Sequence, residues 1–404
     1  MHVLPTRASP AASWKTPSLD ISLVKDRTLL RAPEVERVWR RLGRQSSAPH
    51  AFRHSPEWFE HRLRAEPEGE LLLAMLRDRN GDVSGVSPIL VEDRQIEFAI
   101  GQVMLHTQPL KSAVVLGGVP LLPDDPRAHD ELFHAIASEL PDCEAVELEL
   151  VPRDSFAYRH ITTSPEVREH FYVYEPEAQG KGPVHVVRMP PSFEAYLHKF
   201  SAKTRSKLRR RVTTLHDQRR IELVRYDAPG TGTAFLEAAT RVAEHTWQRR
   251  LGDRFESGSS WPNKLVDLAD HGLLRSFVLF AGDQPCAFVL GIEHDGVLHY
   301  TKPGFDDRYA KFSPGAVLLY LMLEDLFRER TPHTVCFCQG DAPYKRFYAN
   351  AQIDKADVLL LRRGLSRRLL MACHTALRAG VETAKRLLQF RHAKEANHPC
   401  RTMS

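Results

Sequence analysis

Residues 301–321 read TKPGFDDRYAKFSPGAVLLYL, and this stretch decides the fold. It leads from the end of an apolar strand into a long apolar helix. Ser313 is a residue type favoured at a helix N-cap, and Pro314 suits the first helical position, where a missing N–H does no harm. Gly315 then leaves the helix start without a side chain. The pattern predicts a helix whose N-terminus a ligand can approach closely.

A helix start of this kind favours an anion, because free N–H groups and the positive end of the helix dipole point toward it. Such a site favours a phosphate or pyrophosphate at the helix start. The nearby basic residues Lys302, Arg308 and Lys311 add positive charge. The alternative is an ordinary capped helix, since Ser-Pro starts are common.

The segments around this stretch predict one α/β unit. Residues 276–305 contain three apolar runs joined by the turns AGDQP and HDG, which indicates an antiparallel meander. Downstream, TVCFC (334–338) is typical of a buried strand, APYKRFY (342–348) of a short helix, and ADVLLLRR (356–363) of a strand that closes the unit.

The first half of the chain predicts a similar order of helices, meander, helix and strand, without a visible residue-level repeat. We predict an α/β (α+β) chain with two tandem lobes, each a mixed, largely antiparallel sheet flanked by helices. The segment PEAQGKGP (176–183) marks their boundary. The expected divisions are a mobile start at 1–32, lobes at 33–182 and 183–363, and a basic amphipathic helical tail at 364–404.

The composition is that of a folded protein, because 42% of the 404 residues are hydrophobic. The net charge is only +5. The positive excess lies in residues 361–404, which contain ten Lys or Arg residues and two acidic residues, Glu382 and Glu395. Six scattered cysteines form no CxxC pair, so we expect reduced thiols in a cytoplasmic protein. The N-terminus lacks the apolar core of a signal peptide, and no run approaches the roughly 20 apolar residues of a spanning helix.

The tail carries an apolar stripe on a basic helix, formed by Leu369, Leu370, Leu377, Val381 and Leu388. This pattern fits peripheral contact with an anionic inner-membrane surface or with a partner protein. It fits packing against the chain's own lobe equally well.

Several segments resemble the GNAT acyltransferase superfamily, in particular its CelD-like cellulose-biosynthesis branch, which is related to the Fem peptidyltransferases. The similarity is carried by YTKPGFDDRYAKFSPG (300–315) and GDAPYKRFY (340–348), and upstream by HAFRHSPEWFEHRL, FSAKTRSKLRRR and HTWQRRLG. It covers roughly residues 35–363 and is strongest in the second half. The resemblance implies two GNAT-like lobes, with catalysis in the second.

The resemblance also implies a reaction. Acetyl-CoA or another acyl-CoA would lie between two splayed parallel strands, LHYTK (298–302) and TVCFC (334–338). Its pyrophosphate would rest on the backbone of Ser313, Pro314, Gly315, Ala316 and Val317. An acceptor amine would attack the thioester carbonyl, a strand N–H would hold the oxyanion, and the CoA thiolate would leave. The usual glycine-rich loop before the helix is reduced here to Ser-Pro-Gly, and the Fem relatives use aminoacyl-tRNA as the donor instead.

The catalytic groups implied by the resemblance lie in GDAPYKRFY. Tyr344 and Tyr348 share one helix face, and either would stand where the superfamily keeps its acid tyrosine. Lys345 matches a lysine that neutralises phosphate or oxyanion charge. The first candidate for the general base is Asp341, and the alternatives are Glu293 and His299. The competing interpretation is a set of core aromatics beside a solvated lysine and an aspartate that caps the helix.

The acceptor side is assigned to basic and aromatic residues upstream. Lys203 and Arg205 would hold an anionic acceptor or a phosphate, and His245 and Trp247 would line the pocket. A solvated helix face, a capping histidine and a core tryptophan are the alternatives. DNA is not expected, because the basic run 203–211 belongs to an amphipathic helix without interleaved aromatics. No metal is expected, since HxxxH, HExxH and Cys-His clusters at ligand spacing are absent.

The sequence thus predicts an acyl-CoA-dependent N-acyltransferase for an amine on a small molecule, sugar or cell-envelope precursor. Two alternatives stay open. One is a Fem-like transferase that takes its acyl group from aminoacyl-tRNA, the one case in which tRNA would be a partner. The other is a non-catalytic subunit that binds a polysaccharide-synthesis complex through its tail.

Overall fold

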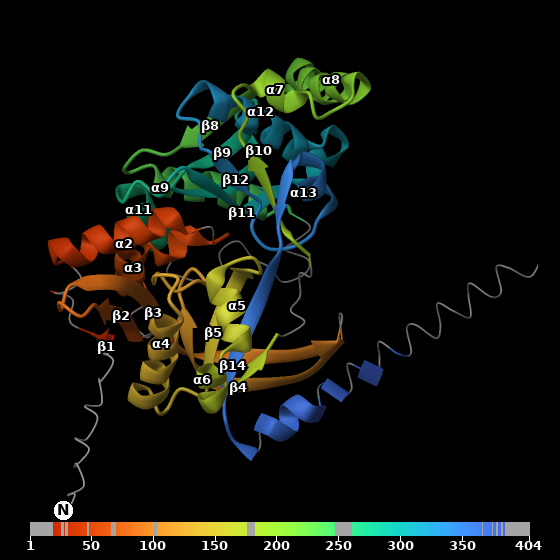
Figure 1. The fold of residues 1–404 in the computed structure, drawn as a ribbon. Coiled ribbons are helices and arrows are strands. Elements are labelled where there is room, and N and C mark those ends of the chain that lie inside the picture. Colours follow the sequence, from red (N-terminus) through yellow and green to blue (C-terminus); the bar gives the residue numbers. More distant parts are fainter. Residues whose placement is uncertain are drawn as a thin grey trace, which may run out of the picture.

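The computed structural model describes residues 19–25, 28, 31–46, 48–65, 70–100, 103–175, 182–246, 261–365, 367–373, 375–376, 379–380 and 383. Within them the chain forms two seven-stranded sheets, each flanked by helices, which occupy the lower and upper halves of Figure 1. Both sheets are mostly antiparallel, with one parallel pair each. The predicted fold class of two mixed, largely antiparallel lobes is confirmed.

The first sheet builds the lower lobe. Its strands, in spatial order, are β1 (Asp20–Val24), β2 (Glu70–Arg77), β3 (Val83–Ile100), β4 (Val103–Val115), β5 (Ala145–Pro152), β14 (Lys355–Arg362) and β6 (Phe171–Tyr174). Within the start that was predicted to be mobile, Asp20–Val24 instead pairs along its whole length with β2.

Helices cover both faces of the first sheet. Those on one face are α4 (Pro126–Glu139), α5 (Phe156–Thr163) and α6 (Pro165–His170), which bury Leu132, Ile136 and Ile161 against the strands. Those on the other are α2 (Pro33–Gln45) and α3 (Pro56–Ala65), which bury Trp39 and Phe59. The short 3-10 helix η1 (Ala51–His54) lies between them in sequence.

The second sheet builds the upper lobe. Its strands, in spatial order, are β13 (Ala351–Ile353), β7 (Val184–Arg188), β12 (Thr334–Cys336), β11 (Val297–Phe305), β10 (Gln284–His294), β9 (Ser276–Ala281) and β8 (Ile221–Tyr226). The predicted meander of residues 276–305 is β9, β10 and β11, joined by antiparallel pairing.

Two groups of helices enclose the second sheet. The helices on one face are α7 (Phe193–Leu197), α8 (Ala202–Arg219), α12 (Pro314–Arg328) and α13 (Pro343–Tyr348), with η2 (Asp307–Phe312) leading into α12. The helices on the other face are α9 (Gly232–Ala243) and α11 (Trp261–Asp270). The apolar face of α12 buries Val317, Leu319 and Leu323, as its sequence pattern predicts.

One strand crosses between the sheets. β14 lies between β5 and β6 of the first sheet, although in the chain it follows β13, a strand of the second sheet. β7 lies between β12 and β13 of the second sheet, in the lobe to which the expected boundary assigns it. In Figure 1 the blue strand β14 runs from the upper lobe down into the lower one. The prediction that residues 356–363 close the second unit is therefore wrong for this strand. Its buried Leu360 belongs to the core of the first sheet.

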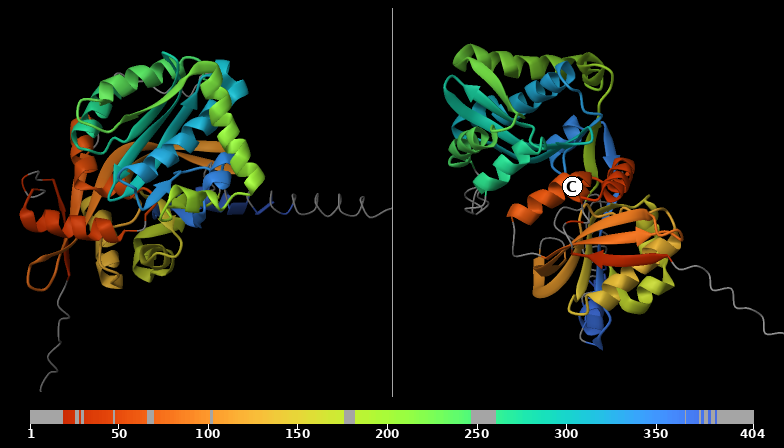
Figure 2. Two further views of the ribbon diagram at one scale, coloured as in Figure 1. Left: turned by 90° about the horizontal axis from the view of Figure 1, so that it is seen from above. Right: turned by 90° about the vertical axis from the view of Figure 1, so that its left-hand side faces the viewer.

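The lobes also share side-chain contacts. Figure 2 shows the red helices α2 and α3 between the two sheets in its right-hand view. Asp267 of α11 accepts hydrogen bonds from His61 Nδ1 at 2.6 Å and Arg64 Nε at 2.8 Å, both of α3. Phe52 of η1 is buried in the core of the second lobe. The two halves therefore form one packed body.

The predicted tail begins as a helix, because the described positions from 365 to 383 are helical. Leu370 and Met371 pack against an apolar cluster of the first sheet that includes Leu359 and Leu361. Leu369 is largely exposed. Leu377, Val381 and Leu388 of the predicted stripe lie outside the described residues. The described part of the tail thus contacts its own lobe.

No helix in the described ranges is both long enough and apolar enough to cross a membrane.

Candidate active site

The parallel strands β11 and β12 separate after a short pairing. Their paired residues run from Val297 with Thr334 to His299 with Cys336, after which β11 continues to Phe305 beside β10. β12 follows β7 instead, since the Phe337 N–H donates to the His185 carbonyl at 2.9 Å. The described residues therefore contain the predicted splay, with one edge of β11 left without a neighbouring strand beyond His299.

A cavity of about 290 Å³ lies at this splay, on the face covered by α12. The side chains around it are almost all apolar or aromatic. They come from β10, β11, the start of α12, and α13, and they include Phe288, Tyr300, Phe305, Leu318, Leu319, Tyr344 and Tyr348. Gly315 and Ala316 in the first turn of α12 also line it. The cavity thus joins the splayed strands to the helix start that the sequence singled out.

The start of α12 offers fewer free amides than predicted. Ser313 occupies the N-cap position in a left-handed conformation with φ 55°, and its side chain makes no capping hydrogen bond. Its N–H donates to the Ala310 carbonyl, while the amides of Ala316 and Val317 donate to the Ser313 carbonyl. Pro314 has no N–H. Among the five predicted residues, Gly315 therefore supplies the amide that has no acceptor within the described chain.

Tyr344 and Tyr348 both reach the cavity, but their hydroxyl groups differ. The Tyr348 hydroxyl donates to the Ala316 carbonyl at 3.3 Å and so links α13 to the first turn of α12. The Tyr344 ring packs beside Tyr300 and Phe337, with centroids 6.3 and 6.2 Å away, and its hydroxyl has no hydrogen-bond partner among the described residues. Tyr344 is thus the tyrosine with an uncommitted donor in the cavity.

Burial raises the pKa of Tyr344, and the nearby Cys338 sulfur raises it further. The phenol stays protonated at neutral pH. In chemical terms it is able to donate a proton but not to accept one.

Lys345 is buried, contrary to the interpretation of it as a solvated surface lysine. Its ammonium group donates to the Gln339 carbonyl in the loop between β12 and α13. Burial lowers the pKa of Lys345, and this effect is opposed by Cys338, Cys336 and Asp341. Its direct contact in the structure is therefore the loop, and it does not line the cavity.

Asp341 is exposed and does not line the cavity. Its carboxylate is 2.8 Å from His185 Nε2 and 2.8 Å from Arg346 Nη1. The His185 contact is the largest cause of a lowered pKa of Asp341, which makes it a weak base. It does not cap α13 either, since no side chain caps that helix. Glu293, the first alternative, is 2.5 Å from Arg275 Nη1 and is likewise neutralised.

His299, the second alternative, faces away from the cavity. Tyr300 points to the α12 face of the sheet, so its neighbour His299 points to the opposite face, where it contacts Phe52 of the first lobe at a ring-centroid distance of 4.6 Å. There it meets Cys336 and Cys338 in a cluster that the sequence analysis did not predict. The search for sequence motifs at ligand spacing did not find this cluster, because the three residues are close only in space.

The predicted acceptor residues are not gathered at the cavity. Lys203 is exposed at the start of α8, and the Arg205 guanidinium donates to the Phe200 carbonyl at 2.8 Å. His245 is exposed after α9, and its carbonyl accepts the Asp307 N–H at 3.1 Å. Trp247 lies outside the described residues. Sequence reasoning in turn missed Tyr300 and Phe288, whose only signal was their place in an apolar strand.

Comparison with protein-family models finds one match, in the part of the chain that holds the cavity. Residues 202–346 match the model of the acetyltransferase (GNAT) domain family. The match runs from α8 into α13 and so contains both splayed strands, α12 and the cavity residues other than Tyr348. No curated protein is matched by the sequence.

Among solved structures, FemX is similar over 84% of this chain and 98% of its own, with 12% identity and a TM-score of 0.57. A conserved protein of unknown function from Bacteroides thetaiotaomicron is similar over 85% of this chain and all of its own, with 11% identity and a TM-score of 0.50. A tandem GNAT protein from the clavulanic acid biosynthesis pathway has 12% identity over 85% and 98% of the two chains, with a TM-score of 0.49.

The similarity to FemX extends over both lobes and therefore concerns the whole fold. The family match concerns the lobe that holds the splay. The chain thus has a fold similar to that of FemX over both lobes, and residues 202–346 are similar to the acetyltransferase (GNAT) domain family.

Proposed function

We propose that the protein transfers an acyl group from an acyl-CoA thioester to an amine. The observation that carries this proposal is the cavity at the β11–β12 splay, which an uncommitted tyrosine hydroxyl enters. A ligand arm placed there would lie against the open edge of β11. A backbone N–H on that edge would hold the oxyanion of the tetrahedral intermediate. The CelD-like assignment from the sequence is part of the same proposal.

The reaction needs one general acid to protonate the leaving thiolate, and we assign this role to Tyr344. The attacking amine forms a bond to the thioester carbonyl carbon, and the carbon–sulfur bond then breaks. The leaving thiolate takes the proton of the Tyr344 hydroxyl, which the raised pKa of Tyr344 keeps in place at neutral pH. Solvent then restores the proton to the phenol.

Removal of the proton from the attacking ammonium group is assigned to solvent. Asp341 and Glu293 are both held in ion pairs, and His299 lies on the opposite face of the sheet. A water path through the open mouth of the cavity replaces them in this proposal. None of the three candidate bases named from the sequence lines the cavity.

Donor binding would involve the cavity and the start of α12 together. The apolar walls suit an acyl group and the pantetheine arm, because they offer few polar partners. The Gly315 amide and the exposed Lys311 ammonium would meet the diphosphate. Lys203 would remain available for an anionic acceptor, such as a sugar or cell-envelope precursor.

One observation favours a second donor. A single free amide at the start of α12 is a small anion site, and the fold is similar to that of FemX. The Fem-like alternative, in which aminoacyl-tRNA supplies the acyl group, therefore stays the second candidate. A non-catalytic role in a polysaccharide-synthesis complex is the third outcome of the test below.

Thermal unfolding of the full chain distinguishes the three. We expect acetyl-CoA or octanoyl-CoA to raise the melting temperature, because a ligand that binds the folded state stabilises it by mass action. The control is Gly315→Phe, which places a large side chain at the cavity and should abolish the shift. A shift with alanyl-tRNA but with no CoA species would support the Fem-like reaction. No shift with any of these would leave the non-catalytic role.

A further inference from the structure

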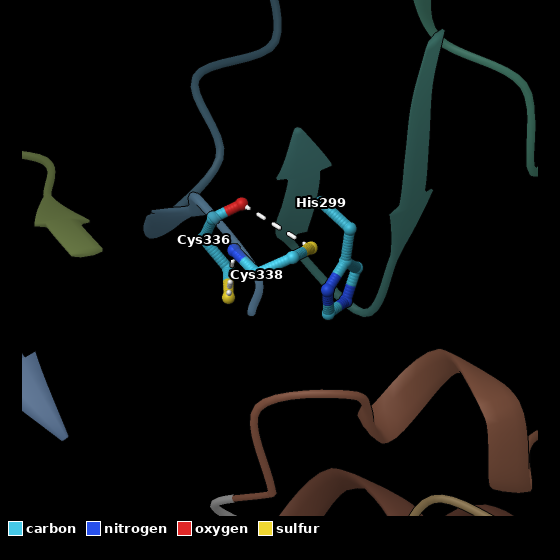
Figure 3. Close-up of side chains that lie close together, drawn as sticks. All are labelled: His299, Cys336 and Cys338. Carbon is cyan, nitrogen blue, oxygen red and sulfur yellow. Dashed lines mark hydrogen bonds between the residues drawn. The ribbon is translucent and has the colours of Figure 1, made fainter. Parts of the chain in front are cut away.

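β11 and β12, whose splay forms the cavity, carry a buried cluster of metal-binding residue types on the opposite face of the sheet. His299 extends from β11, Cys336 ends β12, and Cys338 follows in the next loop (Figure 3). One ligand atom from each, a ring nitrogen and two sulfurs, lies within 4.8 Å of the others. All three side chains are buried, and His299 is fully so.

The histidine in this cluster lacks partners. Both ring nitrogens of His299 are buried and have no hydrogen-bond partner in the described part of the chain. Most buried polar atoms are satisfied, because leaving one unpaired costs about 1–3 kcal/mol. Two unpaired nitrogens on one ring beside two sulfurs are the arrangement expected where a ligand completes the site.

The backbone conformation around Cys338 brings the Cys336 and Cys338 side chains close together. Cys338 has φ 54°, a left-handed conformation that is uncommon for a residue with a side chain. Its N–H lies 3.4 Å from Cys336 Sγ, and its own Sγ lies 3.7 Å from the Cys336 carbonyl, as the dashed lines of Figure 3 show. An N–H directed at sulfur stabilises a thiolate, which is the form that binds metals.

The charges of the donor set also fit a divalent cation. Two thiolates with one divalent cation form a neutral unit, so a metal removes the cost of burying the charge.

The first lobe supplies the remaining wall. The Pro49 carbonyl is 3.5 Å from Cys336 Sγ, and the His50 ring lies 6.5 Å from that of His299. His50 is buried, and its Nδ1 also lacks a partner among the described residues. A fourth ligand is therefore at hand on a segment that follows α2. Two cysteines with two histidines form one of the usual donor sets of a structural zinc site.

We propose that His299, Cys336 and Cys338 bind Zn²⁺, with His50 as the fourth ligand. Zn²⁺ displaces the two thiol protons and binds a neutral imidazole nitrogen from each histidine, without any change of oxidation state. The ligand atoms of His299, Cys336 and Cys338 need to move closer by at most about 1 Å, because the edge of a zinc–thiolate tetrahedron is about 3.8 Å. The His50 ring, whose centroid is 6.5 Å from that of His299, needs to approach them further. The metal fastens the segment after α2 to the splayed strands.

Metal analysis of the full-length protein tests this site. Reduced wild-type protein, dialysed against Zn²⁺ and then against buffer, should retain about one Zn²⁺ per chain. Cys336→Ala and Cys338→Ala should weaken zinc binding by more than about 100-fold. Cys286→Ala is the matched control, since Cys286 is a buried thiol of β10 outside the cluster, and it should retain the metal.

Two further measurements keep the test decisive if a variant folds poorly. Co²⁺ added to the metal-free wild type should give the visible absorption and the sulfur-to-metal charge-transfer band of a tetrahedral thiolate site. Zn²⁺ should raise the melting temperature of the wild type, and His50→Ala should reduce that shift without abolishing it. A reduced wild type that takes up no metal, gives no such Co²⁺ spectrum and shows no melting shift would overturn the proposal. Zinc uptake leaves the acyl-transfer proposal untouched, because the two sites lie on opposite faces of the sheet.

Discussion

Tyr344 and Tyr348 show how one turn of helix separates two roles for the same residue type. Both lie on one face of α13 and both line the cavity. The Tyr348 hydroxyl is committed to the Ala316 carbonyl, whereas the Tyr344 hydroxyl has no partner in the described residues. Sequence spacing placed the pair on one face but left the choice between them open. The choice depends on the carbonyl of a distant helix, which no local pattern contains.

This difference predicts that removing the Tyr344 hydroxyl lowers the rate of the reaction, whereas removing the Tyr348 hydroxyl lowers the stability of the fold. Tyr344→Phe should lower kcat by about 10²- to 10⁴-fold, the usual contribution of a general acid, and leave the melting temperature unchanged. Tyr348→Phe should lower the free energy of unfolding by about 1 kcal/mol, because it removes a hydrogen bond between two helices. Thiol release from acetyl-CoA and urea unfolding measure the two quantities. Tyr172→Phe on β6 serves as the control, and equal kinetic effects of Tyr344→Phe and Tyr172→Phe would contradict the assignment.

Buried histidines predict how stability depends on pH. Burial lowers the pKa of His54 to about 3 and that of His129 to about 4, so both rings are neutral in the folded chain. The unfolded chain takes up protons on them below about pH 6.5. Since the unfolded state then binds more protons, stability falls as the pH falls from about 6.5 toward 4. Each histidine accounts for up to about 1.4 kcal/mol per pH unit in this window.

Urea unfolding at pH 7 and pH 5 checks this slope. His54→Gln, which removes one titrating ring, should make the loss of stability between the two pH values smaller. His216→Gln, at an exposed position of α8, should leave the loss as in the wild type. A slope that is the same in all three proteins would show that His54 is not responsible.

At the scale of elements, the start of α12 shows what a local pattern predicts well. Ser-Pro-Gly predicted where the helix begins, and Pro314 is its first residue. The pattern did not reveal that Ser313 would adopt a left-handed conformation or that three of the five backbone positions would be engaged internally. Those features follow from η2, which turns directly into α12 and ends at Phe312. Hydrogen bonds between adjoining elements are the part that residue types alone do not specify.

Gly315 provides a test of this helix start. A Cβ at position 315 would lie 3.6 Å from the Phe305 ring, which is ordinary contact. Gly315→Ala should therefore fold normally and bind acetyl-CoA within a few-fold of the wild type, since the amide stays free. Gly315→Phe should fold but lose binding, because the larger side chain fills the cavity. Isothermal titration calorimetry compares the three, and unchanged affinity in Gly315→Phe would place the donor elsewhere.

At the scale of the whole molecule, the crossing of β14 into the first sheet is the feature that sequence reasoning missed. The strand pattern of residues 356–363 was recognised, and so was the number of lobes. Its partner strands were not, because a strand's hydrophobic pattern says which face is buried but not which neighbours it has. The order of the chain suggested the nearer lobe. The His299 cluster was missed for the same reason, since its members meet only across two strands and a loop.

The crossing of β14 predicts an unequal result for two truncations. A chain that ends at Asp354 lacks β14, whose Val358, Leu359, Leu360 and Leu361 are all buried. Their loss removes on the order of 6–12 kcal/mol of apolar burial, comparable with the total stability of a domain. We expect limited proteolysis to degrade residues 33–175 in this chain. A chain that ends at Gly364 keeps the strand and should resist, and equal resistance of both would contradict the role of β14.

The position of β14 near the end of the chain also has a consequence for synthesis. When Phe171–Tyr174 leaves the ribosome, the slot beside β5 stays vacant until Lys355–Arg362 has been translated. At about 5–20 residues per second this interval is roughly ten to forty seconds. During it the nascent chain presents two unpaired strand edges, which invite association with other polypeptides. A chaperone that shields these edges would therefore determine how much of the protein matures.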